Sequence, residues 1–375
     1  MPSVQARYRY RLRVTATQAA KLQAVFDTNR LVWNQALGRW GGLWRHEQLP
    51  LSYAVADKEL VDWRSRFEWL GGQPSVPQQQ VLRDLYRSIS AFFDRSNPAG
   101  RPRFKRRRDG YATARWTKRG FGVSGSGVGT AGDRLSVAVG GGRISLVVVW
   151  SRPLPTSPTS MTIYRDRAGQ YWASFVVEVE VPDIAENPTW RSTGLDVGLT
   201  TFATTEDERH DITNPRHGRA AAKALARSQR NMARKTKGSN HRAKCRHQVA
   251  RAHARVANQR ADFHHKAARA LLCSYDRIGV EDLAVRNLSR GAKGRRKTGL
   301  NRSIADAGWA QFRMVLSWQA RKAGKQVVVL PARTPPRGAV VAGREPSPAS
   351  SCRRGCLGAE VVDSSSGGIA MQPGT

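Results

Sequence analysis

The sequence predicts an α/β layer preceded by a small β-barrel or sandwich with an inserted helical segment. Short β-branched runs divided by Gly, Pro and Ser occupy residues 135–181, which favours the β-rich part. Apolar residues recur at helical spacing between positions 18 and 93. Two further apolar strands, 193–201 and 276–283, carry acids and flank a long helical stretch, which is the order of a β, α, β layer.

The length and charge of the chain restrict its class. Its 375 residues are enough for two or three domains, and 63 Lys and Arg against 28 Asp and Glu give a formal net charge of +35. Such a charge predicts a nucleic-acid partner, with an anionic membrane as the weaker alternative. No apolar run is long enough to span a membrane, and residues 1–13 lack the apolar core of a signal peptide. We therefore expect a cytoplasmic protein without a membrane partner.

The N-terminal half supplies the elements of the β-rich and helical parts. Residues 6–14 alternate strictly, which predicts a strand with one basic face that joins the β-rich part. Residues 18–40 predict an amphipathic helix or a helix pair, and 63–70 and 78–93 repeat the pattern with their aromatic residues in a helical core. The strands expected in the β-rich part are 135–139, 144–150, 161–165 and 171–181.

A basic cluster follows the helices. Residues 97–108 begin as a Pro/Gly linker, and Phe104, Tyr111 and Trp116 are interleaved with the basic residues from 103 onward. Charge runs are usually solvated faces, but interleaved aromatic residues favour phosphate contacts combined with stacking on bases or sugars. The nucleic-acid-binding residues predicted here are Arg103, Lys105, Arg106, Arg107 and Arg108.

A second basic region lies between the two acid-bearing strands. Residues 214–260 contain no acid and carry 14 Lys or Arg, with a turn at 237–240, so they predict a basic helical hairpin. Helices this basic repel each other unless a polyanion lies along them. The predicted contacts are Arg230, Arg234, Lys235, Lys237 and Arg242.

Two carboxylates are the candidate catalytic residues. Asp196 stands between Gly194 and Gly198, which leave room for a phosphate or another backbone, although an acid in this setting is more often a turn residue. Glu281 ends the second strand, where the alternative is an ion pair with arginine. Carboxylates at neighbouring strand ends can hold two Mg²⁺ or Mn²⁺ ions for phosphodiester cleavage. The strand and helix order suits a ribonuclease H-like layer.

The remaining C-terminal elements are a basic, flexible loop at 287–302, an amphipathic helix at 303–323 and a strand at 326–330. Cys245 and Cys273 are expected to be buried reduced thiols. Cys352 and Cys356 have three residues between them and no second pair, so they make a poor zinc site.

On these motifs the chain resembles the TnpB (OrfB) family of insertion-sequence proteins, RNA-guided DNA endonucleases similar to the ancestors of type V CRISPR effectors. The matching stretches are Tyr8 to Val14 with the helix to Leu37, Gln78 to Phe93 with Pro102-Arg-Phe-Lys105, Gly194-Leu-Asp-Val-Gly-Leu-Thr-Thr201, Lys237-Gly-Ser239, Asn258-Gln-Arg260, His265-Lys266, Val280-Glu-Asp-Leu283 and Asp306-Ala-Gly-Trp309.

The resemblance implies that Asp196 and Glu281 are the first and second acids of a RuvC-like, Mg²⁺-dependent nuclease. It implies a guide RNA from the element and a double-stranded DNA target. We expect a monomer or a weak dimer. The family label of transposase then refers to a nuclease that retains the element during transposition and DNA recombination, rather than to the strand-transfer enzyme. The alternative is a non-catalytic guide-RNA and DNA-binding protein that acts as a repressor.

The implied domains are a β-barrel from residues 1–14 and 109–185, a helical recognition domain at 15–108 and a nuclease domain at 190–332. The nuclease domain contains the basic hairpin, 215–272. Residues 333–375 are expected to be an aberrant, disordered tail in place of the family's zinc ribbon and third acid.

A frameshift would account for the family motifs that are missing after residue 332. Read one base out of frame, residues 337–343 can spell Gln-Gly-Cys-Ser-Gly-Cys-Gly, and residues 369–375 can spell Asp-Arg-Asn-Ala-Ala-Arg-Asn, which are two family motifs in the family's order. We therefore hypothesise a frameshift near Arg333, from gene decay or a sequencing error. Without the third acid, nuclease activity is expected to be lost or weak while nucleic-acid binding persists.

Overall fold

The computed structural model describes residues 3–46, 52–96, 99–107, 112–125, 129–182, 191–283, 285–288 and 295–331. Residues 1–332 form one compact unit, and the predicted tail, 333–375, lies outside the described residues. None of the described helices is both long and apolar enough to cross a membrane.

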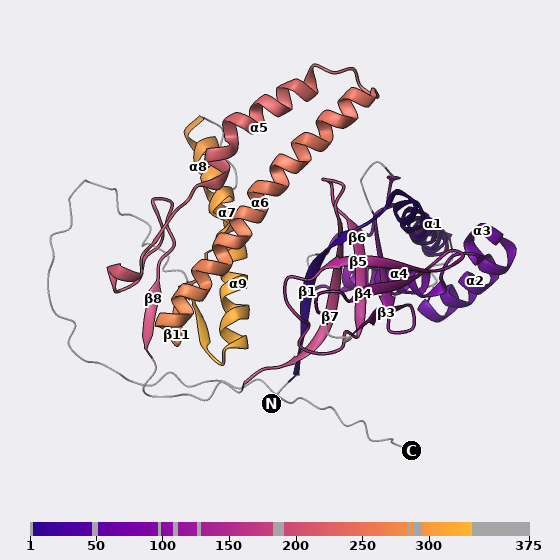
Figure 1. Ribbon diagram of the computed structural model, residues 1–375, viewed down its shortest axis with the longest axis horizontal. Coiled ribbons are helices and arrows are strands. Elements are labelled where there is room, and N and C mark those ends of the chain that lie inside the picture. Colours follow the sequence, from indigo (N-terminus) through magenta and orange to yellow (C-terminus); the bar gives the residue numbers. More distant parts are fainter. Residues whose placement is uncertain are drawn as a thin grey trace. The chain divides into compact units, whose positions relative to one another are not determined.

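The β-rich part is a nearly closed antiparallel barrel of seven strands in the order β2-β6-β7-β1-β5-β4-β3 (Figure 1). The N-terminal strand β1 pairs with both β5 and β7, so the prediction that it joins the β-rich part is confirmed. The strands are β1 (Ser3–Arg13), β2 (Thr113–Thr117), β3 (Phe121–Ser124), β4 (Arg134–Val139), β5 (Gly142–Val149), β6 (Ser160–Arg165) and β7 (Tyr171–Glu180).

The alternation along β1 separates the barrel core from solvent. Its apolar side chains are buried and its basic ones are exposed, as the period of two in a strand requires. The buried residues are Ala6, Tyr8, Tyr10 and Leu12, and the exposed ones are Arg7, Arg9, Arg11 and Arg13.

Strands β2 and β3 were not predicted, because their sequences contain Arg and Gly and resemble the basic cluster that precedes them. Trp116 in β2 is fully buried in the barrel core, and its Nε1 donates a hydrogen bond to the Ala138 carbonyl at 3.0 Å. The expectation that Trp116 stacks on nucleic acid is therefore wrong. Tyr111 and Arg108 lie outside the described residues.

The helices described between β1 and β2 are α1 (Ala16–His46), α2 (Tyr53–Arg66), α3 (Glu68–Gly71) and α4 (Ser75–Phe93). Residues 16–46 form one continuous helix rather than a pair. The helix predicted at 63–70 is interrupted at Phe67, whose backbone is extended. The shared core contains Val32, Trp33, Trp40, Leu60, Leu82 and Leu85, whereas Phe92 and Phe93 of the expected core are partly exposed.

The α/β part is built on three parallel strands in the order β12-β11-β8. Its elements are β8 (Ser192–Leu195), β9 (Thr201–Ala203), β10 (Ile212–Thr213), α5 (His217–Ala233), α6 (Asn240–Ser274), β11 (Arg277–Glu281), α7 (Val285–Leu288), α8 (Arg295–Ala307), α9 (Trp309–Lys322) and β12 (Gln326–Leu330), with a 3₁₀ turn at Glu208–His210. Strand β10 pairs with β9, and a two-residue bridge between Asp196 and Thr204 continues β9 toward β8.

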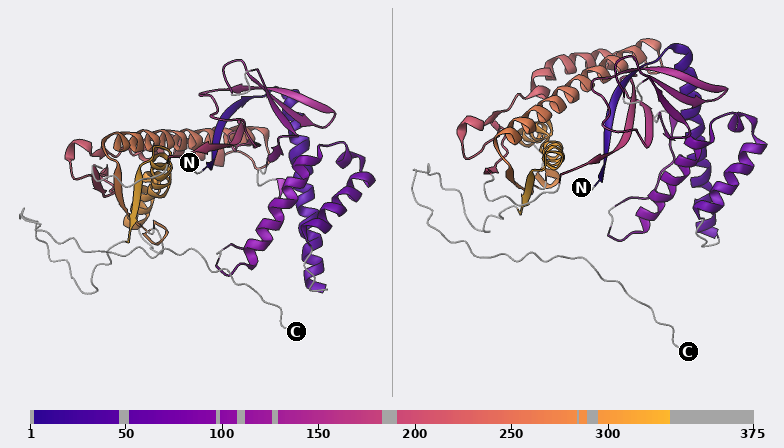
Figure 2. Two further views of the ribbon diagram at one scale, coloured as in Figure 1. Left: turned by 90° about the horizontal axis from the view of Figure 1, so that it is seen from below. Right: turned by 60° about the horizontal axis from the view of Figure 1, so that its bottom comes forward.

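Helices α5 and α6 form the predicted hairpin and lie side by side in every view (Figures 1 and 2). Helices α6 and α9 cover one face of the parallel sheet with apolar side chains, namely Ala267, Ala268, Leu271, Leu272, Trp309, Phe312, Leu316 and Ala320. Cys245 is buried as predicted, but Cys273 is exposed, so that expectation is wrong.

The single helix predicted at 303–323 is broken at Gly308, and α8 begins within the stretch predicted as a loop. Gly308 has a φ of +67°, and a Cβ there would lie 3.0 Å from Arg260 Cδ and 3.2 Å from His264 Cε1. A residue with a side chain is strained in this conformation and has no space, so glycine ends one helix and starts the next.

The burial of Trp116 gives a test of the barrel core. We expect Trp116→Ala to lower the free energy of unfolding of the barrel by about 3–5 kcal/mol, because a fully buried indole is replaced by a cavity. The matched control is Trp69→Ala in α3, where the ring is 53% exposed and less apolar contact is lost. Urea denaturation measures both variants, and equal losses of stability would contradict the assignment of Trp116 to the core.

Candidate active site

The candidate site lies where the parallel strands β8 and β11 end. Leu195 pairs with Val280, so the next residues along each strand, Asp196 and Glu281, continue the same register. Paired residues in parallel strands point to the same face, and carboxyl ends of parallel strands share one edge of the sheet. The fold therefore brings the two predicted acids to neighbouring positions on one face and one edge.

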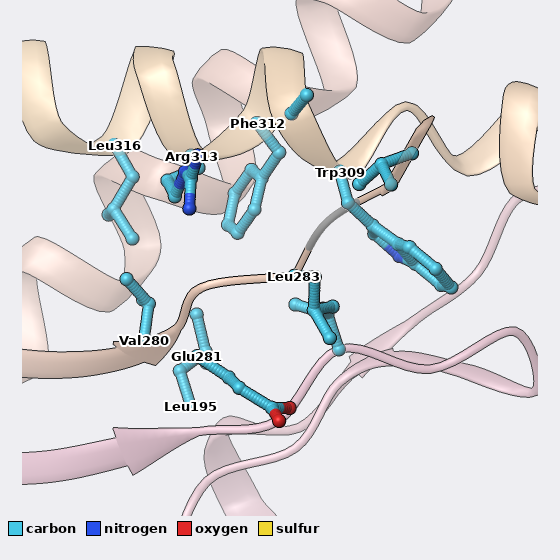
Figure 3. A pocket seen from close by; sticks show the side chains of 11 residues that line it. Leu195, Val280, Glu281, Leu283, Trp309, Phe312, Arg313 and Leu316 are labelled. Atoms are coloured by element: carbon cyan, nitrogen blue, oxygen red, sulfur yellow. The ribbon is translucent and has the colours of Figure 1, made fainter. Parts of the chain in front are cut away.

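The acids lie on the face of the sheet opposite to the face that α6 and α9 cover. Leu195, Ile278 and Val280 are buried under the helices, whereas Gly194, Asp196 and Glu281 are exposed on the opposite side. Figure 3 shows the Glu281 carboxylate turned away from the apolar side chains of α9 that line the small cavity behind it. Both carboxylates are accessible to a solvent-borne ligand.

The backbone around Asp196 is held in place. Its N–H donates to the Thr204 carbonyl at 3.1 Å, and the Thr204 N–H donates back at 2.8 Å. The turn that follows is tight: a Cβ at Gly198 would lie 2.8 Å from the Thr201 carbonyl oxygen. Glycine at 198 therefore admits the chain's own backbone, while the Cβ position at Gly194 opens onto free space.

Neither candidate acid makes an ion pair or hydrogen bond through its carboxylate within the described part of the chain. The neighbouring Asp282 is different, because its carboxylate pairs with Arg313. The arginine ion pair considered for Glu281 is thus made by the next residue instead. Among the described residues, no three His, Cys, Asp or Glu side chains come close enough to hold a metal ion. Asp196 and Glu281 fit a hard divalent cation as two ligands of an incomplete set.

A carboxylate at the opposite edge ties the starts of all three strands together. Asp276, which precedes β11, accepts a hydrogen bond from the Arg191 N–H at 3.2 Å and pairs with Lys325 Nζ at 2.9 Å. Arg191 precedes β8 and Lys325 precedes β12. The hydrogen bond from Lys325 holds the pKa of Asp276 below its usual range. The periodicity of each strand does not predict this contact, because its three residues are far apart in the sequence.

A second carboxylate, Asp306, fixes the base of the basic hairpin. It accepts hydrogen bonds from the N–H groups of Gly218, at 2.7 and 2.9 Å, and Arg219, at 3.1 Å, so it caps the start of α5 from a distant part of the chain. Arg260 of α6 pairs with the same carboxylate at 3.1 Å. Asp306 belongs to a stretch that matches the family, but its sequence pattern predicts no role for the carboxylate.

The predicted nucleic-acid contacts on the hairpin divide into two groups. Arg230, Arg234, Lys235 and Lys237 are exposed around its tip. Arg242 instead donates to the carbonyls of Met232 and Lys235, at 3.0 and 2.9 Å, and thereby closes the turn between the helices. The structure brings the hairpin residues together but does not place them with the basic cluster after α4.

In the basic cluster after α4, Arg103, Arg106 and Arg107 are exposed and Lys105 is turned inward. The Lys105 ammonium lies 3.2 Å from the centroid of the Trp33 ring. Burial lowers the pKa of Lys105 to about 7. Binding of nucleic acid by each of these residues stays a prediction.

The sequence is similar to those of known proteins. A family model described as "Probable transposase" matches residues 174–292, and one described as "Helix-turn-helix domain" matches residues 1–48. A Streptomyces pristinaespiralis protein named "Putative RNA-guided DNA endonuclease" is 35% identical over 334 residues, which cover 88% of this chain and 78% of that protein. The chain belongs to the TnpB family.

A second TnpB-family relative, "Putative RNA-guided DNA endonuclease InsQ" of Escherichia coli (strain K12), is 30% identical over 86% of this chain and 80% of its own length. A chain of a solved CRISPR-Cas12f ternary complex aligns with 85% of this chain over 72% of its own length, at 10% identity and a TM-score of 0.35. The description "Helix-turn-helix domain" does not fit the structure of the segment that it matches, since residues 3–13 form a strand and residues 16–46 form one helix.

The contact at Asp276 predicts a pH-dependent loss of stability. We expect Asp276→Asn to lower the free energy of unfolding by about 1–3 kcal/mol at neutral pH, because the Lys325 ammonium loses its charged partner. The folded-state pKa is depressed, so the wild-type stabilisation is present above the ordinary aspartate pKa and is lost as pH falls through the lower folded value.

Denaturation at neutral and acid pH measures this effect, and the difference between wild type and variant should shrink in acid. Asp262→Asn is the control, because its pair with Lys266 is exposed and contributes about 0–1 kcal/mol. A difference between wild type and Asp276→Asn that stays constant with pH would contradict the argument.

Proposed function

We propose that this TnpB-family chain is built as an RNA-guided DNA endonuclease whose catalytic carboxylates are Asp196 and Glu281, with the nuclease step impaired in the sequence as written. The observation that carries the proposal is the pair of exposed, unpaired carboxylates aligned at the ends of neighbouring parallel strands. The curated relatives are named as RNA-guided DNA endonucleases, which supports the same general activity.

The topology supports a ribonuclease H-like nuclease domain of the RuvC kind. When the Asp196–Thr204 bridge is included, the strands follow the order β10-β9-β8-β11-β12, with β9 antiparallel to its neighbours and β8, β11 and β12 parallel. An antiparallel hairpin continued by parallel strands, with helices on one face, is typical of that class. We propose residues 190–332 as this domain, 15–108 as a helical recognition domain, and 1–14 with 109–185 as the barrel.

The acids of this edge suit Mg²⁺ or Mn²⁺, which prefer oxygen ligands. A bound pair of such ions supplies an activated water and stabilises the leaving oxygen of a cleaved phosphodiester. In this chain the bridge to Thr204 orients Asp196, the end of β11 positions Glu281, and the open surface at Gly194 leaves room for a backbone phosphate. Exposed basic residues at the hairpin tip attract the polyanion, since α5 contains no acid.

The impairment follows from what the family pattern requires after residue 332. A third acid and the cysteine pairs of a zinc ribbon are expected there, and the written sequence has neither motif. Two carboxylates alone hold a divalent cation weakly. The second candidate function, a non-catalytic RNA and DNA-binding protein that acts as a repressor, is favoured by this missing acid.

A repaired chain tests the catalytic assignment. We expect the written chain, loaded with guide RNA in Mg²⁺, to cut target DNA weakly or not at all, and a fusion of residues 1–332 to the C-terminal segment of the Streptomyces relative to regain cleavage. In the fusion, Asp196→Ala or Glu281→Ala should lower the cleavage rate by about a hundredfold or more, because each removes a metal ligand.

The matched control in the fusion is Asp282→Asn, whose carboxylate pairs with Arg313 rather than facing the site. Cleavage that survives in Asp196→Ala would remove the proposed mechanism. Ordinary cleavage by the written chain would refute its impairment, and intact DNA repression without cleavage would favour the second function.

The frameshift hypothesis makes a separate prediction. The gene's nucleotides after the codon of Arg333, read one base out of frame, should spell the cysteine motif within residues 337–343 and the acid motif within 369–375. Sequencing of the genomic locus measures this directly. Codons that spell neither motif would reject the hypothesis.

A further inference from the structure

The segment after α4 is fixed along α1 on both sides of Phe104. Trp33 Nε1 donates to the Arg103 carbonyl at 3.0 Å, the Asn34 amide donates to the Lys105 carbonyl at 2.9 Å, and the Lys105 N–H donates back to Asn34 at 2.8 Å. Three hydrogen bonds with the adjacent helical residues Trp33 and Asn34 therefore hold the backbone that carries Phe104. A surface side chain on such a support loses little conformational freedom when it binds.

The support turns Lys105 inward and Phe104 outward. Lys105 lies over the Trp33 ring, while Phe104 is 57% exposed. The ring rests against α1 at Gly38, where a Cβ would lie 3.9 Å from Phe104 Cε1. The hydrogen bonds of the neighbouring residues thus keep the apolar ring of Phe104 at the surface, where it is only partly buried.

A groove with a basic wall surrounds this ring. Leu37, Gly38 and Gly41 of α1 form one side, and the other side consists of Arg101, Pro102, Arg103, Phe104 and Arg106. The Arg101 guanidinium lies 5.5 Å from the centroid of the Trp40 ring. Within the described ranges no ion pair joins Arg101, Arg103 or Arg106 to a carboxylate, so these three guanidinium groups have no acidic partner in that part of the chain.

Two other exposed aromatic residues, Phe67 and Trp69, have a different setting. Phe67 and Trp69 contact each other, with ring centroids 6.0 Å apart, and the acidic Glu68 stands between them in the sequence. A ring beside unpaired arginines suits a ligand with both an aromatic face and negative charge, which is a nucleotide. A paired base inside a duplex has no free face, so the nucleotide must be unpaired.

We propose that this groove binds an unpaired nucleotide of a single-stranded stretch of RNA or DNA. Phe104 stacks on the base, and Arg101, Arg103 and Arg106 contact the neighbouring phosphates. The inference rests on the proposed function for the presence of such strands, and it adds a site for one nucleotide that is independent of the acids Asp196 and Glu281.

The test uses the full chain and single-stranded RNA and DNA oligonucleotides of one sequence with an internal 2-aminopurine. We expect Phe104→Leu to weaken binding about five- to fiftyfold and to reduce the quenching of 2-aminopurine, because leucine keeps an apolar side chain in the groove but cannot stack. Phe104→Trp should retain both signals. The matched control is Phe67→Leu, an exposed ring outside the groove, which should change neither signal.

The arginines have a separate signature. The combined replacement of Arg101, Arg103 and Arg106 by Gln should lower the slope of log affinity against log salt by roughly 2, since each phosphate contact on a single strand contributes about 0.7. Phe104→Leu should leave this slope unchanged. The oligonucleotide type, RNA or DNA, whose affinity depends on Phe104 identifies the source of the nucleotide.

The outcomes separate the two proposals. Wild-type binding that Phe104→Leu does not alter overturns the nucleotide site and leaves the nuclease assignment intact. A chain that binds structured guide RNA but neither single strand also overturns the nucleotide site alone. A chain that binds no nucleic acid overturns both.

Discussion

The parallel register of β8 and β11 is the constraint on which the candidate site depends. Strands rise by about 3.3 Å per residue and alternate their faces, so a slip by one residue would move Glu281 along the edge and turn its carboxylate into the apolar side under α9. The contacts of Asp276 with Arg191 and Lys325 oppose such a slip, because they join the starts of all three strands. One carboxylate at the far edge thus sets the separation of two others at the near edge.

A carboxylate from a distant segment also positions the basic hairpin. Helix α5 has no buried residue and no acid, so its own sequence contributes little packing and considerable repulsion. Its position depends on α6 and on Asp306, whose carboxylate accepts two backbone N–H groups at its start and the guanidinium of Arg260. Two paired acids of the α/β part, Asp276 and Asp306, therefore join distant segments, whereas Asp196 and Glu281 make no ion pair among the described residues and mark the candidate site.

Periodic patterns predicted much of this architecture. The alternation of β1, the hairpin of α5 and α6, the strands β4 to β7 and the two acid-bearing strand ends were all readable, because each reflects a local period or a charge run. The break at Gly308 was missed, since nearby apolar residues continue the helical period while the space there is filled by Arg260 and His264. Trp116 was misplaced because a basic neighbourhood outweighed its membership of a short strand. The roles of Asp276 and Asp306 arise from contacts between distant segments, which no local rule detects.

The two acids are separated along the chain by the whole of α5 and α6, yet they meet through adjacent strands. Bringing such distant segments together costs loop entropy before any contact compensates, and non-local parallel pairing is correspondingly slow. The hairpin can form early from neighbouring helices, whereas the acid pair exists only after β11 has inserted between β8 and β12. During synthesis, the positively charged surface of the hairpin would therefore form before the pair of acids is assembled.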